Sequence, residues 1–412
     1  MKILLVNNFY YNRGGDCTYL FSLKRLLEEK GHKVIIFSMH HPQNFESEYS
    51  KYFVSYINYA DMAKNKSLSS GLKVLFRSIY SREAKKKMEK LIETEKPDIA
   101  HLNNIRQHVT TSILPVLKKN KIPIVWTLHD YQLICPNITF LSRGKICEKC
   151  KKRKYYWPVL TKCKKNSFLA SMMAAVEHSI QMFSNVYDNT DVFICPSEFL
   201  KNKYIEYGFN EKKLSTLRHF IDNDRASEYG SAGDYLLYAG RLSEEKGVRT
   251  LIDAVNKLRT VKLKIVGDGL LKEELMAYVR SIKLENMVEF CGHRSHEEVE
   301  GLIKKCLFVV LPSEWYEVFG LVVLEAFACG KPVVASRIGG VTEFIKDGAD
   351  GLTFEPGNVE DLSLKIDCLA KNPGRVVEMG EAGRSFVTQE MNAEIYYAKL
   401  MEIYKRAISV KS

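Results

Sequence analysis

The sequence predicts an α/β fold built from two doubly wound, Rossmann-like domains. Short apolar runs rich in β-forming residues alternate with segments whose apolar residues recur at helical spacing. This alternation occurs twice, and a polar, glycine-containing stretch at residues 222–234 separates the two series. A length of 412 residues also suffices for about two to three domains of ordinary size.

The first domain begins with the apolar run 2–6, followed by a polar loop and by leucines at helical spacing that end at Gly31. This order predicts a strand, a loop and a helix. Further buried strands are predicted where apolar runs recur with enough chain between them for a helix, at residues 34–37, 98–101, 124–128 and 191–195. Strands joined by helices form a parallel sheet, so we assign residues 1–200 to this domain.

The second domain repeats the alternation, and we assign residues 201–389 to it. Its predicted strands are the runs 235–239, 261–266, 287–290, 307–311, 332–335 and 352–354. Residues 392–406 predict a final helix. Ligands of such sheets bind outside the carboxyl ends of the strands, so the loops after the strands should carry the site, in a cleft between the domains.

Composition excludes several classes of protein. Hydrophobic residues make up 46% and charged residues 27% of the chain, which excludes wholesale disorder. The sequence holds no apolar run of the ~18 to 20 residues that cross a bilayer, and its apolar start is too short for a signal-peptide core. We therefore expect a cytoplasmic protein whose ten cysteines stay reduced.

The positive charge is concentrated in the first half. Lysine and arginine exceed aspartate and glutamate by 14 in residues 1–200 (31 against 17), whereas residues 201–412 carry a net charge of −2 (30 against 32). This asymmetry indicates an anionic partner for the first half, either nucleic acid or an anionic membrane surface.

Two glutamates and a glycine mark the start of a helix in the second domain. Glu317 lies just before this helix, Gly320 at its start and Glu325 about two turns further on. Free amides at a helix start bind phosphate, and carboxylates accept hydrogen bonds from sugar hydroxyls. The alternative is a pair of solvated glutamates on a surface helix.

Cations and glycines follow other strands of the same domain. Arg241 and Lys246 come after the first of these strands, where they could hold a diphosphate, or could form only a charged turn. Glycines after the next strands would let a nucleotide approach the backbone, although any left-handed turn would also use them; they are Gly267, Gly269, Gly339 and Gly340.

In this order, the motifs GRLSEEKG, VGDG, PSEWYEVFGLVVLEAFACGKPVVAS, IGG and DGADG resemble those of the family 4 retaining glycosyltransferases of GT-B fold, bacterial surface-polysaccharide type. The resemblance extends over essentially the whole chain, because Gly14, Gly15 and the pair His129 and Asp130 match the family's glycine loop and His-Asp turn. It implies an acceptor-side first domain, a donor-binding second domain and a helix within 390–412 that crosses back onto the first domain.

The resemblance also implies roles for individual residues. Glu317 would hold the transferred sugar and His129 would lie beside it, both as catalytic residues, although a histidine here could also cap a helix or belong to the core. The donor would be bound by Gly14, Gly15, Arg241, Lys246, Gly267, His293, the amides of Phe319, Gly320 and Leu321, and, at the ribose, Glu325. Relatives commonly carry glutamate where this chain has Cys17, so that contact would be absent or supplied by Asp16.

A basic, cysteine-containing insertion at residues 135–165 follows the predicted His-Asp turn. Cys135, Cys147, Cys150 and Cys163 could hold a structural zinc ion as four thiolates, or could be scattered cysteines with Cys135 buried. Residues 145–165 hold nine lysines or arginines against one glutamate, with aromatic residues among them. Such a patch could dock on an anionic membrane and border a lipid-linked acceptor, or could be a solvated basic loop.

Together with these observations, the resemblance implies a glycosyltransferase that moves a sugar from a nucleotide-sugar donor to a glycan or lipid-linked acceptor. The resemblance alone implies its place in capsule, exopolysaccharide or O-antigen assembly. We expect it at the inner face of the membrane, with no cofactor required for catalysis. Two alternatives are a zinc-dependent nucleic-acid-binding protein, which leaves the second-domain motifs unexplained, and a non-catalytic nucleotide-sugar-binding scaffold.

Overall fold

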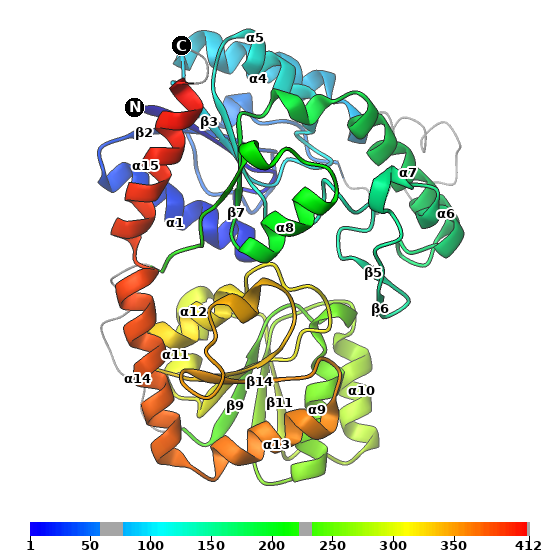
Figure 1. Cartoon of the computed structure of the whole chain (residues 1–412), viewed down its shortest axis with the longest axis vertical. Helices are drawn as coiled ribbons and strands as arrows, with labels where there is room; N and C mark the ends of the chain where they lie inside the picture. The colour runs from blue at the N-terminus through cyan, green and yellow to red at the C-terminus, as the bar shows by residue number, and fades with distance from the viewer. Residues whose placement is uncertain (58–76, 222–232, 410–412) are drawn as a thin grey trace.

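The chain forms two domains, each built on a six-stranded parallel sheet (Figure 1). A computed structural model describes residues 1–57, 77–221 and 233–409. The two doubly wound domains predicted from the sequence are confirmed. Most of the stretch predicted to separate them, residues 222–234, lies outside the described residues.

The first sheet has the strand order β2-β1-β3-β4-β7-β8. Its strands are β1 (Lys2–Val6), β2 (Lys33–Phe37), β3 (Ile99–Leu102), β4 (Ile124–Thr127), β7 (Val192–Cys195) and β8 (Leu214–Thr216). The helices are α1 (Gly15–Glu29), α4 (Arg82–Glu95), α5 (Leu114–Lys119), α6 (Trp157–Thr161), α7 (Phe168–Phe183) and α8 (Glu198–Glu206). The order reverses between β1 and β3, which opens a binding position at the carboxyl ends of these strands.

The predicted boundary at residue 200 is wrong, because the first sheet continues beyond it. Strand β8 pairs with β7 in parallel, with Ile194 opposite Ser215. Helix α8 connects the two strands, and its cap residue Ser197 accepts a hydrogen bond from the Leu200 amide at 3.2 Å. The first domain therefore includes residues 201–216, which hold the last helix and strand of its sheet.

The second sheet has the order β11-β10-β9-β12-β13-β14. Its strands are β9 (Tyr235–Ala239), β10 (Lys262–Val266), β11 (Val288–Gly292), β12 (Phe308–Leu311), β13 (Val333–Ser336) and β14 (Gly351–Phe354). The helices are α9 (Val248–Leu258), α10 (Lys272–Ser281), α11 (His296–Lys304), α12 (Leu321–Ala328), α13 (Val359–Ala370) and α14 (Pro373–Glu390). The binding position of this sheet lies between β9 and β12.

The final helix, α15 (Ala393–Ser409), packs against the first domain (Figure 1). Two of its tyrosine hydroxyls are buried and hydrogen-bonded. The Tyr396 hydroxyl contacts that of Tyr19 on α1 at 2.5 Å, and the Tyr404 hydroxyl contacts His101 Nδ1 on β3 at 2.6 Å. The chain enters this helix beside the connection between the domains, where the Ile221 amide donates to the Met391 carbonyl at 2.9 Å. The C-terminal helix thus belongs to the core of the first domain.

Replacing Leu400 by alanine should lower the free energy of unfolding of the first domain by about 2–5 kcal/mol, because the side chain on α15 is fully buried. Urea unfolding would measure this change. Alanine at the exposed neighbour Lys399 is the control and should change the free energy by less than about 0.5 kcal/mol. Equal effects of the two substitutions would show that α15 does not contribute to the domain core.

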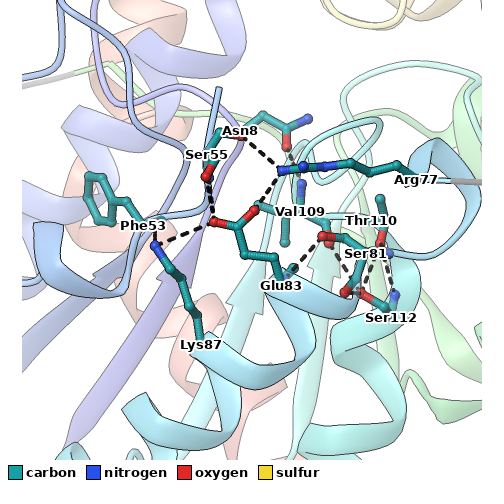
Figure 2. A network of polar contacts seen from close by, with 11 residues as sticks. Asn8, Phe53, Ser55, Arg77, Ser81, Glu83, Lys87, Val109, Thr110 and Ser112 are labelled. Carbon is teal, nitrogen blue, oxygen red and sulfur yellow. Dashed lines mark hydrogen bonds and ion pairs between the residues drawn. The ribbon is translucent and has the colours of Figure 1, made fainter. Parts of the chain in front are cut away.

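A polar network fixes the chain that follows β2 to the start of α4 (Figure 2). The Glu83 carboxylate accepts hydrogen bonds from the Ser55 amide and hydroxyl at 2.9 and 2.7 Å, and pairs with Arg77 at 2.6 Å. Burial opposes ionisation of Glu83, but these hydrogen bonds and cations hold its pKa below the usual range. The Ser81 side chain caps α4 by accepting from the Ala84 amide at 3.1 Å.

The insertion at residues 135–165 contains a small hairpin of β5 (Leu141–Ser142) and β6 (Lys145–Ile146), and ends with α6. In Figure 1 the hairpin extends from the first domain towards the second. Within the described residues, none of the helices combines the length and the apolar character needed to span a bilayer.

Candidate functional site

The loop between β12 and α12, residues 312–320, joins the second domain to the first. The Ser197 hydroxyl donates to the Val318 carbonyl at 2.8 Å, and the Tyr131 hydroxyl donates to the Tyr316 carbonyl at 2.9 Å. Next to them the rings of His219 and Phe319 meet edge to face, with centroids 4.8 Å apart. This loop, which carries Glu317, is therefore held from both domains.

Glu317 is buried in an ion pair with Lys246. One carboxylate oxygen, Oε2, accepts from Lys246 Nζ at 2.8 Å, from the Ser313 hydroxyl at 2.7 Å and from Trp315 Nε1 at 3.0 Å. Burial alone would raise the pKa of this carboxyl, but the Lys246 ammonium and the hydrogen bonds together hold it below the usual range. Glu317 is therefore an ionised, oriented carboxylate with its other oxygen, Oε1, outside these three bonds.

The starts of two helices face each other beside this carboxylate. Gly320 caps α12 in the left-handed conformation (φ 84°), which favours glycine. Gly15 begins α1 of the other domain, and a Cβ atom there would lie 3.2 Å from Leu321 Cδ1 at the start of α12. The first amides of each helix have no acceptor within their own helix and carry its positive dipole end. Two helix starts, a type of element that can bind phosphate, thus converge from the two domains.

His129 lies on the first-domain side in a stack of rings. Its Nε2 contacts Asn103 Oδ1 at 2.9 Å, and its ring stacks on that of His219 with centroids 5.5 Å apart. Burial lowers the pKa of His129 to about 4, although the nearby Asp16 carboxylate acts in the opposite direction. His129 is therefore a neutral imidazole near pH 7, able to exchange hydrogen bonds with hydroxyl groups without adding charge.

The loop at the start of α1 turns its acid, Asp16, toward this region. Cys17 is fully buried, and burial raises the pKa of its thiol far above the usual range. Asp16 instead accepts a long hydrogen bond from Asn104 Nδ2 at 3.4 Å, and its charge acts on both His129 and Asp130. Cys17 Sγ accepts a weak hydrogen bond from Asn7 Nδ2 at 3.8 Å in the interior, whereas Asp16 remains partly exposed.

The remaining predicted donor residues surround the second-domain strand ends. Arg241 is largely exposed and lies 3.6 Å from Glu245 Oε1. Glu325 lies 3.7 Å from His296 Nδ1, and both side chains line a small cavity. Gly267 donates to the Gly292 carbonyl at 2.9 Å, and His293 follows on the exposed loop after β11. The structure thus places Lys246 and Glu317 in contact with each other, whereas Arg241 and Glu325 have other partners.

Gly339 and Gly340 support the loop that carries Glu317. Gly340 donates to the Glu317 carbonyl at 2.6 Å. A Cβ atom on Gly339 would lie 2.3 Å from that carbonyl oxygen and 2.4 Å from the Glu317 amide nitrogen. The sequence left open whether these glycines admit a nucleotide or serve a left-handed turn. Gly339 is left-handed, with a φ of 73°, and the pair makes room for residues 316–318 and for Ser197.

The four cysteines of the insertion lie close enough for their charges to interact. Burial raises the pKa of the Cys135 thiol to about 11, and the neighbouring Cys163 adds to the increase. Burial likewise raises the pKa of the Cys150 thiol, and the other three cysteines add to that increase. Across residues 1–57, 77–221 and 233–409, no three histidine, cysteine or acidic side chains are arranged so that they could hold a metal ion. The structural zinc ion therefore stays a prediction.

Sequence reasoning missed several residues of this junction. His219 was not found because β8, the strand before it, has only three residues and no apolar run. Ser313 and Trp315 precede Glu317 by four and two residues in the motif PSEWYEVFG. This closeness in sequence could have indicated that they contact its carboxylate. Tyr131 and Ser197 follow predicted strands, but their partners lie 185 and 121 residues away.

Comparisons with known protein families and structures identify the class of this protein. The family model for Glycosyltransferase Family 4 matches residues 13–225, and that for Glycosyl transferases group 1 matches residues 222–386. The structure is similar to that of Anabaena Alr3699/HepE in complex with UDP and glucose, with a TM-score of 0.63 and 19% identity, over 98% of this chain and 99% of that one. The two family models define a glycosyltransferase, and the shared architecture gives it the GT-B fold.

The chain belongs to Glycosyltransferase Family 4, whose model matches more than half of its residues. Two relatives extend over nearly its whole length. An "Uncharacterized 42.6 kDa protein in cps region" of Klebsiella pneumoniae is 28% identical, over 89% of this chain and 96% of that protein. An "Uncharacterized glycosyltransferase MJ1178" of Methanocaldococcus jannaschii is also 28% identical, over 94% of this chain and 93% of that protein. The resemblance noted from the motifs is thereby confirmed.

Proposed function

We propose that this glycosyltransferase transfers a sugar from a nucleotide-sugar donor to a glycan or lipid-linked acceptor, with retention of the anomeric configuration. The observation that carries the proposal is the meeting of two helix starts beside the Lys246–Glu317 pair. The Klebsiella relative from a cps region supports a role in capsule, exopolysaccharide or O-antigen assembly.

The donor diphosphate lies between the starts of α1 and α12 in this proposal. As the bond to the sugar breaks, the leaving nucleoside diphosphate gains negative charge, which the helix-start amides and Arg241 stabilise. The Arg241 guanidinium lies mostly in solvent, and its ion pair with Glu245 Oε1, at 3.6 Å, is long and weak. Arg241 can therefore turn toward a diphosphate at little cost in free energy. Catalysis in this form needs no bound metal ion.

Glu317 and His129 position the sugar in this proposal. The three hydrogen bonds to Glu317 Oε2 fix the carboxylate, so that its free oxygen can accept hydrogen bonds from sugar hydroxyls. The sugar becomes oxocarbenium-like in the transition state, and the neutral His129 adds no positive charge that would oppose this. Glu325 accepts from the donor ribose, and His293 lies near the nucleobase.

Thermal unfolding with UDP, GDP, ADP, CMP and their common sugar conjugates tests the donor site. A true donor binds only the folded protein, so it should raise the melting temperature, and Arg241→Ala should weaken this binding by about tenfold through loss of a charge-assisted contact. Arg280→Ala, at an exposed position of α10, is the matched control and should bind the donor normally. Donor binding that is equal in the two variants would remove Arg241 from the site.

The same preparation separates the proposal from its alternatives. Donor binding without transfer to any acceptor would indicate a non-catalytic scaffold. Tight, salt-sensitive RNA binding without any nucleotide-sugar binding would indicate a nucleic-acid-binding protein.

A further inference from the structure

Helix α7 presents an apolar stripe to solvent. All of its exposed side chains are apolar, and they recur every three or four residues, so they lie along one face. They are Phe168, Leu169, Met172, Val176, Ile180 and Phe183, with exposed fractions between 38% and 67%. An apolar surface that is continuous over a helix of 16 residues marks an interaction site rather than scattered exposure.

The opposite face of α7 carries polar residues that are buried and paired. Glu177 forms an ion pair with Arg106 at 3.3 Å, and Gln181 Oε1 accepts from the Tyr187 hydroxyl at 2.6 Å. Ser171 Oγ accepts from the Lys164 amide at 3.0 Å. Rotating the helix to bury its apolar stripe would break these contacts and leave the buried Arg106 guanidinium without its Glu177 partner. The fold therefore fixes the outward orientation of the stripe.

The neighbouring insertion extends the stripe and adds positive charge. Leu160 of α6 is 64% exposed and Tyr156 just before it is 54% exposed. The Arg153 guanidinium lies 6.0 Å from the Phe183 ring centroid, which places a cation at the end of the stripe. Further exposed cations of the insertion, outside the β5–β6 hairpin, are Lys149, Lys152, Lys154, Lys162 and Lys165.

We infer that α6, α7 and these cations form a docking surface for an anionic lipid bilayer, with the apolar stripe in the membrane interface and the cations at the headgroups. The combination of apolar and aromatic side chains with charge of a single sign matches such a membrane and distinguishes it from a neutral partner surface. Figure 1 shows α6 and α7 side by side at the edge of the first domain farthest from α15.

This surface is connected to the candidate site through the insertion. Glu148 accepts from the Tyr316 hydroxyl at 2.8 Å, one residue from Glu317, and pairs with Lys203 at 2.9 Å. The insertion that carries these cations thus also contacts the loop that carries Glu317, and in the proposed function a bilayer on α7 would lie on the acceptor side. The orientation rests on the proposed function, since it matters only if the acceptor is lipid-linked, whereas binding to the bilayer does not depend on catalysis.

Co-sedimentation with vesicles of phosphatidylglycerol and phosphatidylcholine tests the inference. We expect the full chain to bind vesicles rich in phosphatidylglycerol and to bind pure phosphatidylcholine at least about tenfold more weakly. The double substitution Leu169→Ser with Phe183→Ser should reduce binding at least about tenfold, because it removes two large apolar side chains from the stripe. The double substitution Lys152→Gln with Lys154→Gln, on either side of Arg153, should reduce it also, and more strongly at low salt.

Matched controls use equally exposed positions elsewhere. Leu364→Ser with Val377→Ser removes two apolar side chains from the second domain, and Lys283→Gln with Lys405→Gln removes two charges; both should bind vesicles like the unmodified chain. Absence of vesicle binding, or binding that the α7 substitutions leave unchanged, would overturn the inference. Self-association lost in the α7 variant without vesicle binding would instead assign this face to a second copy of the chain.

Donor binding, measured on the same variants by thermal unfolding, keeps the two proposals separate. An α7 variant that loses vesicle binding but keeps its donor shift would support the docking surface independently. Normal vesicle binding by a chain that binds no nucleotide sugar would contradict the proposed function and leave the docking surface intact.

Discussion

Glu317→Gln should reduce sugar transfer by about 100-fold or more while the protein stays folded. The substitution keeps the shape of the side chain but removes the charge that pairs with Lys246. In the proposed function this carboxylate also accepts hydrogen bonds from sugar hydroxyls, and losses of this size follow removal of one preorganised polar group. Transfer kinetics with the identified donor would measure it, alongside the melting temperature.

The control for this substitution is Glu314→Gln, three residues away on the same loop. Glu314 Oε1 accepts from the Thr250 hydroxyl on α9, whereas Lys246 donates to Glu317. Its glutamine variant should therefore transfer sugar at close to the normal rate. A folded Glu317→Gln protein with undiminished transfer would remove Glu317 from the catalytic residues.

Alanine at Glu317 should have a different effect from glutamine. It leaves the Lys246 ammonium, whose side chain is 15% exposed, without its partner, so the free energy of unfolding should fall by about 3–5 kcal/mol. Glu317 therefore contributes to the stability of the fold as well as to the candidate site. The burial of the pair shows that activity must be compared between folded variants.

The sequence was sufficient to predict both sheets because the strands are buried on both faces. In β1, for example, four successive residues, Ile3 to Val6, are fully buried, so the strand forms a continuous apolar run. Strand β8 lacks this signal, since only Leu214 of its three residues is buried, and the domain boundary was placed too early as a consequence.

The site was predicted as a set of positions but not as a set of contacts. Lys246 and Glu317 were assigned separately, to the diphosphate and to the sugar, because their separation of 71 residues gives no indication that they pair. Likewise α7 contains apolar residues in every turn, so its sequence alone does not distinguish its two faces. The buried partners of Glu177 and Gln181 show which face points inward.

Gly339→Ala should lower transfer by about 100-fold through displacement of Glu317, without any change to a group that contacts substrate. Gly339 has a φ of 73°, and its added methyl group would overlap the Glu317 backbone, at 2.3 Å from the carbonyl oxygen and 2.4 Å from the nitrogen. Backbone atoms cannot move aside as a flexible side chain can, so the loop of residues 316–318 must shift. A displacement of about 1 Å at a catalytic group is sufficient for a loss of this size.

Gly348→Ala separates displacement from backbone strain. Gly348 also has a positive φ, 86°, but a methyl group there meets no atom within 4 Å. Both substitutions therefore carry the cost of about 1–2 kcal/mol for a left-handed alanine, and only Gly339→Ala adds the overlap with Glu317. Similar melting temperatures with a loss of transfer in Gly339→Ala alone would show that the position of the Glu317 loop controls the reaction. Equal transfer by both variants would mean that the loop tolerates the shift, and that Glu317 does not have to be held in place by the glycine pair.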